Sequence, residues 1–236
     1  MYALLDWDST LRTGATIFTL MQFLCDEGVI PPRTLEEKAE IIETFRRGEI
    51  SHDELSSQIN LHYLSCLRGL SEERYNALLA AYLQQDAGPH IPTTEVLVPW
   101  LRSHAIDAVV VSGSPLRALQ PHFPWIGVVD AFALVEGVTD GVLDGTRISD
   151  GGCGKEAAAQ HCRERFGATP LLAMGDSESD YPLLRQARMP IMVGDCPLPE
   201  DCRWPCRRIP NQQAEGASQL RTLLEELDRI LQEEKL

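Results

Sequence analysis

The chain begins with a short apolar run that ends in acidic residues. Residues 2–5 leave no room for a helical turn before Asp6, so the run predicts a buried strand that opens into a loop. Similar apolar runs of strand length occur much later, at 107–111, 171–174 and 191–193. Because these runs are continuous rather than alternating, they predict strands whose two faces are both covered.

The residues between the first two of these runs have a helical pattern instead. Apolar residues recur at helical spacing from 17 to 24, and capping-box sequences that start at Thr34 and Ser51 predict the beginnings of two more helices. Ser71, which is followed by acidic residues in the first turn, predicts a fourth helix. We therefore predict a bundle of four helices, at 13–88, inserted after the first strand.

After this insert, predicted helices alternate with predicted strands. The remaining elements are a helix around 97–101, a turn at 112–115, a short strand at 126–131, a hairpin of 132–135 and 142–143, helices from Lys155 and around 183–187, a loop at 195–211 and an amphipathic helix at 217–231. Such alternation predicts an α/β fold: a three-layer, Rossmann-like, mainly parallel sheet with helices on both faces. The predicted core is discontinuous, at 1–12 and 89–236, and the helical cap at 13–88 interrupts it.

Composition and charge limit the class of protein. The 236 residues are 44% hydrophobic and 24% charged, which is ordinary for a globular protein with one sizeable domain and a smaller one. The net charge of -14 argues against binding to nucleic acid or anionic membranes, which requires basic surface. No apolar stretch approaches the about 18 residues of a membrane span, and no secretory signal is evident, so we expect a cytoplasmic protein. The seven cysteines lack the spacing of a zinc site and are expected to be reduced thiols.

Acidic and hydroxyl residues directly follow three of the predicted strands. Asp6 and Asp8 follow the first strand, Ser112 follows the second, and Asp176 and Asp180 follow a later one. One such acidic pair alone is more often a solvated strand end than a site, but ligands of parallel α/β sheets bind outside the carboxyl ends of the strands. We therefore predict that these side chains meet at one edge of the sheet, with Asp6 and Asp8 pointing to the same side.

Such a cluster of carboxylates requires a cation. Two unit charges about 4 Å apart repel each other by about 4 kcal/mol at an effective dielectric constant of about 20. Carboxylate oxygens without histidine or cysteine favour Mg²⁺ over zinc. The hydroxyls of Thr10 and Ser112, the amides near Gly113 and the ammonium of Lys155 suit a phosphate, because an anion between Lys155 and its helix start satisfies both. Taken singly, Ser112 also fits a turn and Lys155 a solvated surface.

The order of these residues resembles the haloacid dehalogenase superfamily of phosphatases, in the branch that has a helical cap after the first strand. The four family motifs are matched, in order, by Asp6-Trp-Asp-Ser-Thr-Leu11, Val111-Ser-Gly113, Lys155 and Gly175-Asp-Ser-Glu-Ser-Asp180. The resemblance covers nearly the whole chain. The Asp-Ser-Thr-Leu sequence of the first motif is similar to that of phosphoserine phosphatases.

The resemblance implies a Mg²⁺-dependent phosphomonoester hydrolase that acts on a small phosphorylated metabolite. Asp6 would be the nucleophile, ionised in an exposed loop, and would form an aspartyl-phosphate. Asp8 would protonate the leaving alcohol and then activate the water that hydrolyses the intermediate. The helical insert would act as a lid. Mg²⁺ would be held by the Asp6 carboxylate, the main-chain carbonyl of Asp8 and Asp176, with Asp180 in support, and the phosphate by Thr10, Ser112, Gly113 and Lys155.

The chain departs from phosphoserine phosphatases at the residues that grip the amino-acid end of their substrate. An acidic residue after their first motif and an arginine of their cap correspond, without gaps, to Ala15 and Ser57. Neither side chain binds an ammonium or a carboxylate group strongly, so the resemblance does not extend to phosphoserine as the substrate. Other charged residues remain as substitutes, namely Arg12, Arg46, Arg47 and Glu49, and apolar cap residues suit either the cap's own core or the site, namely Ile17, Phe18 and Met21.

Other functions are compatible with the same or similar motifs. The same motifs permit phosphotransfer to an acceptor other than water, including a mutase reaction, and only the cap separates these from hydrolysis. A non-catalytic phosphate-binding protein with a retained site is a further alternative, against which the intact acidic motifs and Lys155 argue. A response-regulator domain is also phosphorylated on aspartate, but the large helical insert and the second acid at Asp8 weigh against it.

Overall fold

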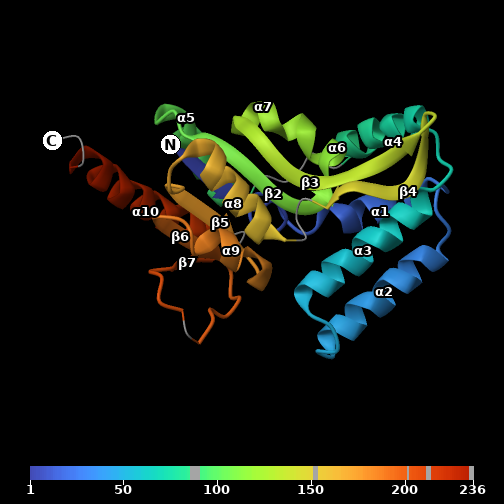
Figure 1. The fold of residues 1–236 in the computed structure, drawn as a ribbon, viewed down its shortest axis with the longest axis horizontal. Coiled ribbons are helices and arrows are strands. Elements are labelled where there is room, and N and C mark those ends of the chain that lie inside the picture. Colours follow the sequence, from blue (N-terminus) through green and yellow to red (C-terminus); the bar gives the residue numbers. More distant parts are fainter. Residues whose placement is uncertain (86–90, 151–153, 201, 211–213, 234–236) are drawn as a thin grey trace.

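A single mixed sheet forms the centre of the molecule (Figure 1). In the computed structural model, which describes residues 1–85, 91–150, 154–200, 202–210 and 214–233, seven strands lie in the order β4-β3-β2-β1-β5-β6-β7. Every neighbouring pair is parallel except β3 and β4. The strands are β1 (Tyr2–Leu5), β2 (Asp107–Pro115), β3 (Val128–Thr139), β4 (Val142–Asp150), β5 (Leu172–Gly175), β6 (Met189–Val193) and β7 (Arg207–Ile209).

Helices connect these strands and cover the sheet. They are α1 (Thr16–Asp26), α2 (Arg33–Arg46), α3 (His52–Leu67), α4 (Glu72–Gln85), α5 (Pro92–Ser103), α6 (Leu116–Leu119), α7 (Phe123–Ile126), α8 (Lys155–Phe166), α9 (Tyr181–Leu184) and α10 (Ala214–Glu233), with 3-10 turns η1 (Gln120–His122) and η2 (Glu178–Asp180). Within the described ranges, none of these helices has the length and apolar character needed to cross a membrane.

The alternating side chains of β1 show how the layers are built. Ala3 and Leu5 point into a core that α5 and α10 complete, whereas Tyr2 and Leu4 point into a second core against α8 and α9. Successive residues of a strand face opposite sides of the sheet, so a continuous apolar strand requires cover on both faces. The predicted three-layer, mainly parallel α/β fold is confirmed.

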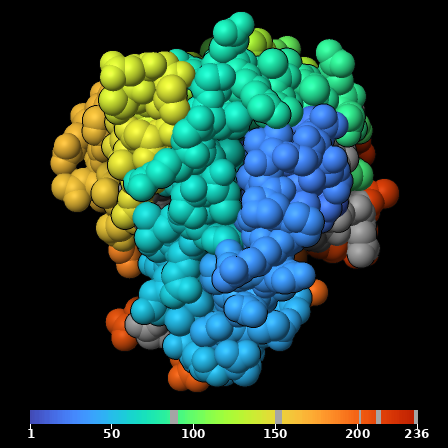
Figure 2. Space-filling model, turned by 90° about the vertical axis from the view of Figure 1, so that its right-hand side faces the viewer, coloured from blue at the N-terminus to red at the C-terminus, as the bar shows by residue number. Residues whose placement is uncertain are grey.

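Helices α1 to α4 gather at one end of the sheet, with α10 at the opposite end (Figure 1). Seen from the end where α1 to α4 lie, these four helices form most of the surface, and the β3–β4 hairpin lies beside them (Figure 2). Leu134 of β3 and Leu143 of β4 belong to the same buried cluster as the apolar residues of the four helices. The backbone of Leu143 also exchanges hydrogen bonds of 2.9 Å with Gly69 and Leu70, so the hairpin is packed and bonded to the helices.

We propose that the chain divides into a core of residues 1–12 and 89–236 and a cap of residues 13–88. The helices of the cap share a buried apolar cluster that is separate from the two clusters on the faces of the sheet. The boundary at 88 and 89 lies outside the described residues. The tip of the β3–β4 hairpin belongs to the core in this division, but it packs with the cap.

Two local predictions about helix starts had different outcomes. The capping box at Ser51 is confirmed, because Ser51 Oγ accepts from the Glu54 backbone at 3.3 Å and Glu54 accepts from the Ser51 backbone at 2.7 Å. The capping box at Thr34 is wrong, because α2 already begins at Arg33, two residues before the start that a Thr34 cap implies, and Pro32 precedes it without a side-chain cap. Proline has a fixed φ that already suits the first turn of a helix, so no cap is needed to start α2 there.

The strands also differ from the prediction in extent. The strand expected at 126–131 and the first arm of the hairpin form one strand, β3, which pairs with β2 at one end and with β4 at the other. The turn expected at 112–115 is the end of β2, because Pro115 pairs with Leu134. The loop expected at 195–211 contains β7, whose two arginines conceal it from an apolar pattern.

Candidate active site

The carboxyl ends of β1, β2 and β5 meet because these three strands are parallel neighbours in the sheet. Asp6 is the first residue beyond β1, and its backbone N–H donates to Met174 of β5 at 3.0 Å. The Asp6 side chain is therefore held between the ends of two strands, and the residue is only 5% exposed. This is the sheet edge at which the acidic residues were predicted to gather.

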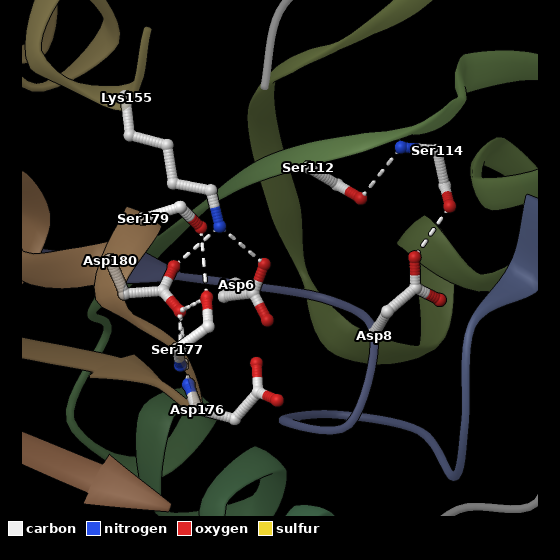
Figure 3. Close-up of polar contacts among 9 residues, drawn as sticks. All are labelled: Asp6, Asp8, Ser112, Ser114, Lys155, Asp176, Ser177, Ser179 and Asp180. Carbon is white, nitrogen blue, oxygen red and sulfur yellow. Dashed lines mark hydrogen bonds and ion pairs between the residues drawn. The ribbon is translucent and has the colours of Figure 1, made fainter. Parts of the chain in front are cut away.

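Lys155 lies between two of the predicted carboxylates (Figure 3). Its Nζ donates to Asp6 Oδ1 at 2.7 Å and also to Asp180 Oδ1. All three residues are buried. Burial by itself favours the neutral form of the lysine, but the two carboxylates outweigh burial and raise the pKa of Lys155. The ammonium is therefore charged at any physiological pH.

The turn after β5 is organised around Asp180. Its Oδ2 accepts from the backbone N–H groups of Asp176 and Ser177 and from Ser177 Oγ, each at 3.0 Å. Gly175 permits this turn, because a Cβ built on it would lie 2.3 Å from both Cβ and Cγ of Asp180. Asp180 thus holds Asp176 in position and does not itself line the cavity described below.

We expect Gly175→Ala to lower the free energy of unfolding by about 1–3 kcal/mol, because the added methyl group must displace Asp180. The matched control for stability is Gly113→Ala, whose Cβ would meet nothing closer than Asn60 Nδ2 at 4.0 Å. Urea unfolding measures the stability of both variants. Equal stability of the two variants would show that the turn accommodates a methyl group at Gly175 without displacing Asp180.

Asp8 lies at the same edge but bonds to other partners. Its Oδ1 accepts from the backbone of Thr16 at 2.7 Å and from Thr16 Oγ1 at 2.6 Å, and its Oδ2 accepts from Ser114 Oγ. In Figure 3 the Asp8 carboxylate points toward Ser114 and away from Asp6. Asp6 and Asp8 both line the cavity described below, but their carboxylates bond to different partners, because β1 ends at Leu5 and strand alternation stops there.

Ser114 was not identified from the sequence. Its backbone N–H donates to Ser112 Oγ at 3.1 Å while its own hydroxyl binds Asp8, so it links two predicted site residues. A hydroxyl donates and accepts, so Ser114 can bond to Asp8 with or without a proton on the carboxyl group. The sequence contained a signal for Ser114, because Ser112 and Ser114 are two residues apart and such residues lie on the same face of a strand.

These side chains surround a cavity of about 220 Å³. Six of the predicted site residues line it, namely Asp6, Asp8, Ser112, Gly113, Lys155 and Asp176. Thr10 does not: it is fully buried beneath the loop, and its hydroxyl has no hydrogen-bond partner. The cap provides the other wall, and of its lining residues only Ile17 and Phe18 were expected from the sequence, as part of either the cap core or the site. Its lining residues include Ile17 and Phe18 of α1 and His52, Leu55, Ser56, Ile59 and Asn60 of α3.

Two of the acidic residues, Asp6 and Asp176, have pKa values above that of an ordinary aspartate. Burial, together with the negative charge of Asp180, raises the pKa of Asp6 to about 7 despite the nearby lysine. Burial and the charges of Asp6 and Asp180 raise the pKa of Asp176 to about 9. The expectation that Asp6 lies in an exposed loop is wrong, because the cap and the turn after β5 enclose it.

The residues present fit a hard cation. Carboxylate oxygens of Asp6, Asp176 and Asp180 all lie within 4.8 Å of one another. Both oxygens of Asp180 already accept hydrogen bonds, whereas Asp6 Oδ2 is buried without a hydrogen-bond partner. An orphaned buried acceptor beside a second carboxylate is costly unless a cation satisfies it. A donor set of oxygens alone suits Mg²⁺ better than a softer metal.

Comparison with known proteins assigns the family. Residues 3–185 match the sequence profile of the haloacid dehalogenase-like hydrolases. The chain belongs to this family. No curated protein matches it. The resemblance inferred from the four motifs is therefore confirmed, and the protein is a hydrolase of this family.

Solved structures with a similar fold include phosphoserine phosphatases. A substrate-bound phosphoserine phosphatase shares 20% identity at a TM-score of 0.64, covering 95% of this chain and 97% of its own. An aspartyl-phosphate analogue of a phosphoserine phosphatase shares 22% at 0.58, covering 81% and 85%. A protein of unknown function from Bordetella pertussis Tohama I shares 18% at 0.67, covering 81% and 89%. At these identities the likeness concerns the fold.

Proposed function

We propose that the protein is a Mg²⁺-dependent phosphatase that hydrolyses small phosphomonoesters through an aspartyl-phosphate on Asp6. The observation that carries the proposal is the state of the Asp6 carboxylate. One oxygen is fixed by Lys155, and the other is buried without a hydrogen-bond partner beside Asp176 (Figure 3). The family and the phosphoserine phosphatases among its structural neighbours support the same chemistry.

In the first step an oxygen of Asp6 attacks phosphorus, and the bond from phosphorus to the leaving alcohol breaks. Asp8 transfers its proton to the leaving oxygen, so the alcohol departs neutral. In the second step Asp8 takes a proton from water, the water oxygen attacks phosphorus, and the bond to Asp6 breaks to release phosphate. Ser114 keeps Asp8 in position in both steps by donating its hydroxyl hydrogen to Asp8 Oδ2, so the Asp8 proton remains available for the leaving oxygen.

Lys155 and Ser112 stabilise the phosphoryl oxygens during both steps. Lys155 supplies a buried positive charge beside Asp6. Ser112 Oγ accepts from Ser114, which leaves its own hydrogen available to donate into the cavity. Fixed donors of this kind stabilise the charge that spreads over the transferring group. The metal, held by Asp6, Asp176 and the main-chain carbonyl of Asp8, would neutralise charge on the phosphoryl group and on the carboxylates.

The stability of the metal-free protein should depend on pH. Asp6 and Asp176 have pKa values of about 7 and about 9, above the ordinary 3.8. Between the ordinary and the raised pKa values, the folded protein therefore binds more protons than the unfolded chain. The free energy of unfolding should therefore fall as pH rises from about 4 to about 9. Mg²⁺ displaces these protons, so its stabilising effect should increase with pH.

Urea unfolding with EDTA or with Mg²⁺ at about pH 5, 7 and 9 measures this effect. A matched control is Asp107→Asn, which removes an aspartate at the opposite edge of the sheet and should leave the Mg²⁺ response unchanged. A Mg²⁺ effect that is absent, or that is equal at all pH values, would contradict the proposed metal site.

Activity is tested by phosphate release from p-nitrophenyl phosphate with Mg²⁺, with EDTA, and with added alcohol acceptors. We expect Mg²⁺-dependent release that equals nitrophenol formation when water is the acceptor. Phosphate release that falls behind nitrophenol in the presence of acceptors would favour a phosphotransferase instead. No turnover of any phosphomonoester would contradict the phosphatase proposal.

A further inference from the structure

The cap wall of the cavity is largely apolar. Ile17 and Phe18 of α1 and Leu55 and Ile59 of α3 line it. Of the apolar α1 residues that suited either the cap core or the site, Met21 is fully buried in the cap cluster and does not line the cavity. Ile17 and Phe18 also pack in the cap cluster, but both line the cavity, where they would face the leaving group. Apolar side chains of this kind bind the carbon atoms of a ligand by removing them from water.

The charges of the cavity lie on the core side. The carboxylates and the lysine that line the cavity in the described part of the chain all come from the core, namely Asp6, Asp8, Lys155 and Asp176. On the cap side, His52 is the titratable residue among the described lining. Burial and the nearby charge of Lys155 lower the pKa of His52, which keeps its imidazole neutral at physiological pH.

The charged residues that were alternatives for gripping a substrate are bonded elsewhere. Arg12 donates to Thr16 Oγ1 at 2.9 Å and to the hydroxyl of Tyr82, within the cap. Arg46 is paired with Glu43, and Arg47 is paired with Glu49, all on the exposed surface of the cap. None of these residues is among those that line the cavity in the described part of the chain.

Besides Ser56, two neutral polar side chains lie within the cap wall, Asn60 and His52. Asn60 is buried opposite the phosphate-binding segment, because a Cβ on Gly113 would lie 4.0 Å from its Nδ2. His52 Nδ1 is a buried atom without a hydrogen-bond partner. An amide and a neutral imidazole both donate and accept hydrogen bonds, so they suit an uncharged hydroxyl or amide on the ligand.

We propose that the cap wall selects phosphomonoesters whose leaving alcohol is small, uncharged and partly apolar, and excludes those that carry a carboxylate or an ammonium group. This inference rests on the phosphatase proposal and names its substrate class. A cavity of about 220 Å³ is smaller than the about 300–1,000 Å³ of pockets for drug-sized ligands, so the alcohol is small. A charged group placed against Ile17, Phe18, Leu55 and Ile59 would lose its hydration without gaining an opposite charge.

The test compares phosphomonoesters of similar size. We expect kcat/KM for n-propyl phosphate and glycerol 3-phosphate to exceed that for 3-phosphoglycerate and phosphoserine by at least about tenfold, the scale of one methylene in an apolar pocket. Equal or higher kcat/KM for the two carboxylates would overturn the inference and leave the phosphatase proposal intact. Failure of the whole series and of p-nitrophenyl phosphate would instead contradict the phosphatase proposal.

A gain-of-function variant tests the location of the selection. Ser56 lines the cavity from α3, so Ser56→Arg places a cation in the cap wall. We expect kcat/KM for 3-phosphoglycerate to rise at least about tenfold relative to n-propyl phosphate. Ser65→Arg, on an exposed turn of the same helix, is the matched control and should leave the ratio unchanged. A ratio that does not differ between the two variants would overturn the assignment of the cap wall.

Discussion

Asp6→Asn is expected to reduce phosphate release by at least about 10⁴-fold, because the amide nitrogen and oxygen of asparagine do not replace a nucleophilic carboxylate. The fold should survive the change. The pKa of Asp6 is raised to about 7 in its buried position, and asparagine resembles the protonated acid in size and charge. The variant should therefore unfold at a urea concentration no lower than that of the wild type without metal, and it should bind Mg²⁺ more weakly.

Asp107→Asn is the matched control for this experiment. Asp107 begins β2 beside Tyr2, at the edge of the sheet opposite the site, so its loss should leave phosphate release within about twofold of the wild type. Acid-quenched wild-type protein should carry a phosphoryl group that Asp6→Asn lacks. Full activity of Asp6→Asn would remove Asp6 as the nucleophile, whatever the control shows.

Lys155→Met is expected to have a large effect on stability as well as on activity. Methionine has nearly the length of lysine but no charge, so Asp6 and Asp180 would remain buried without their cation. Removing one partner of a buried ion pair costs about 3–5 kcal/mol. Loss of a fixed donor to the phosphoryl group should lower phosphate release by about 10³-fold in addition.

Arg185→Met is the matched control, because it removes a positive charge that is exposed and not buried. Arg185 is paired with Glu156, one residue after Lys155, but both side chains are about half exposed. An exposed pair contributes at most about 1 kcal/mol, so this variant should unfold close to the wild type and keep its activity. If Lys155→Met were as stable as Arg185→Met, the buried network of Lys155 would not hold the turn after β5 in place.

The order of the elements and the members of the acidic site were available in the sequence. Continuous apolar strands that alternate with helices admit few arrangements, and the carboxyl ends of parallel neighbours must lie together. Asp6, Ser112, Lys155 and Asp176 are far apart in the chain, yet this rule brings them to one edge, where the structure places them. The turn after β5 could also be located in the sequence, because Gly175 and Asp180 lie within one short segment directly after an apolar strand.

Only the tertiary structure decided the surroundings of these residues. Burial of Asp6, the bonding of Asp8 to Ser114 and the position of Thr10 outside the cavity depend on where the chain turns after β1, which no periodicity describes. The neutral cap wall depends on which face of α1 and α3 turns toward the core. A helix with apolar residues on several sides does not specify that face, because its own bundle and the site both favour apolar contacts. The local pattern therefore determined which acidic, hydroxyl and lysine side chains meet at the edge of the sheet, and the packing of the cap against the sheet decided what lines the opposite wall of the cavity.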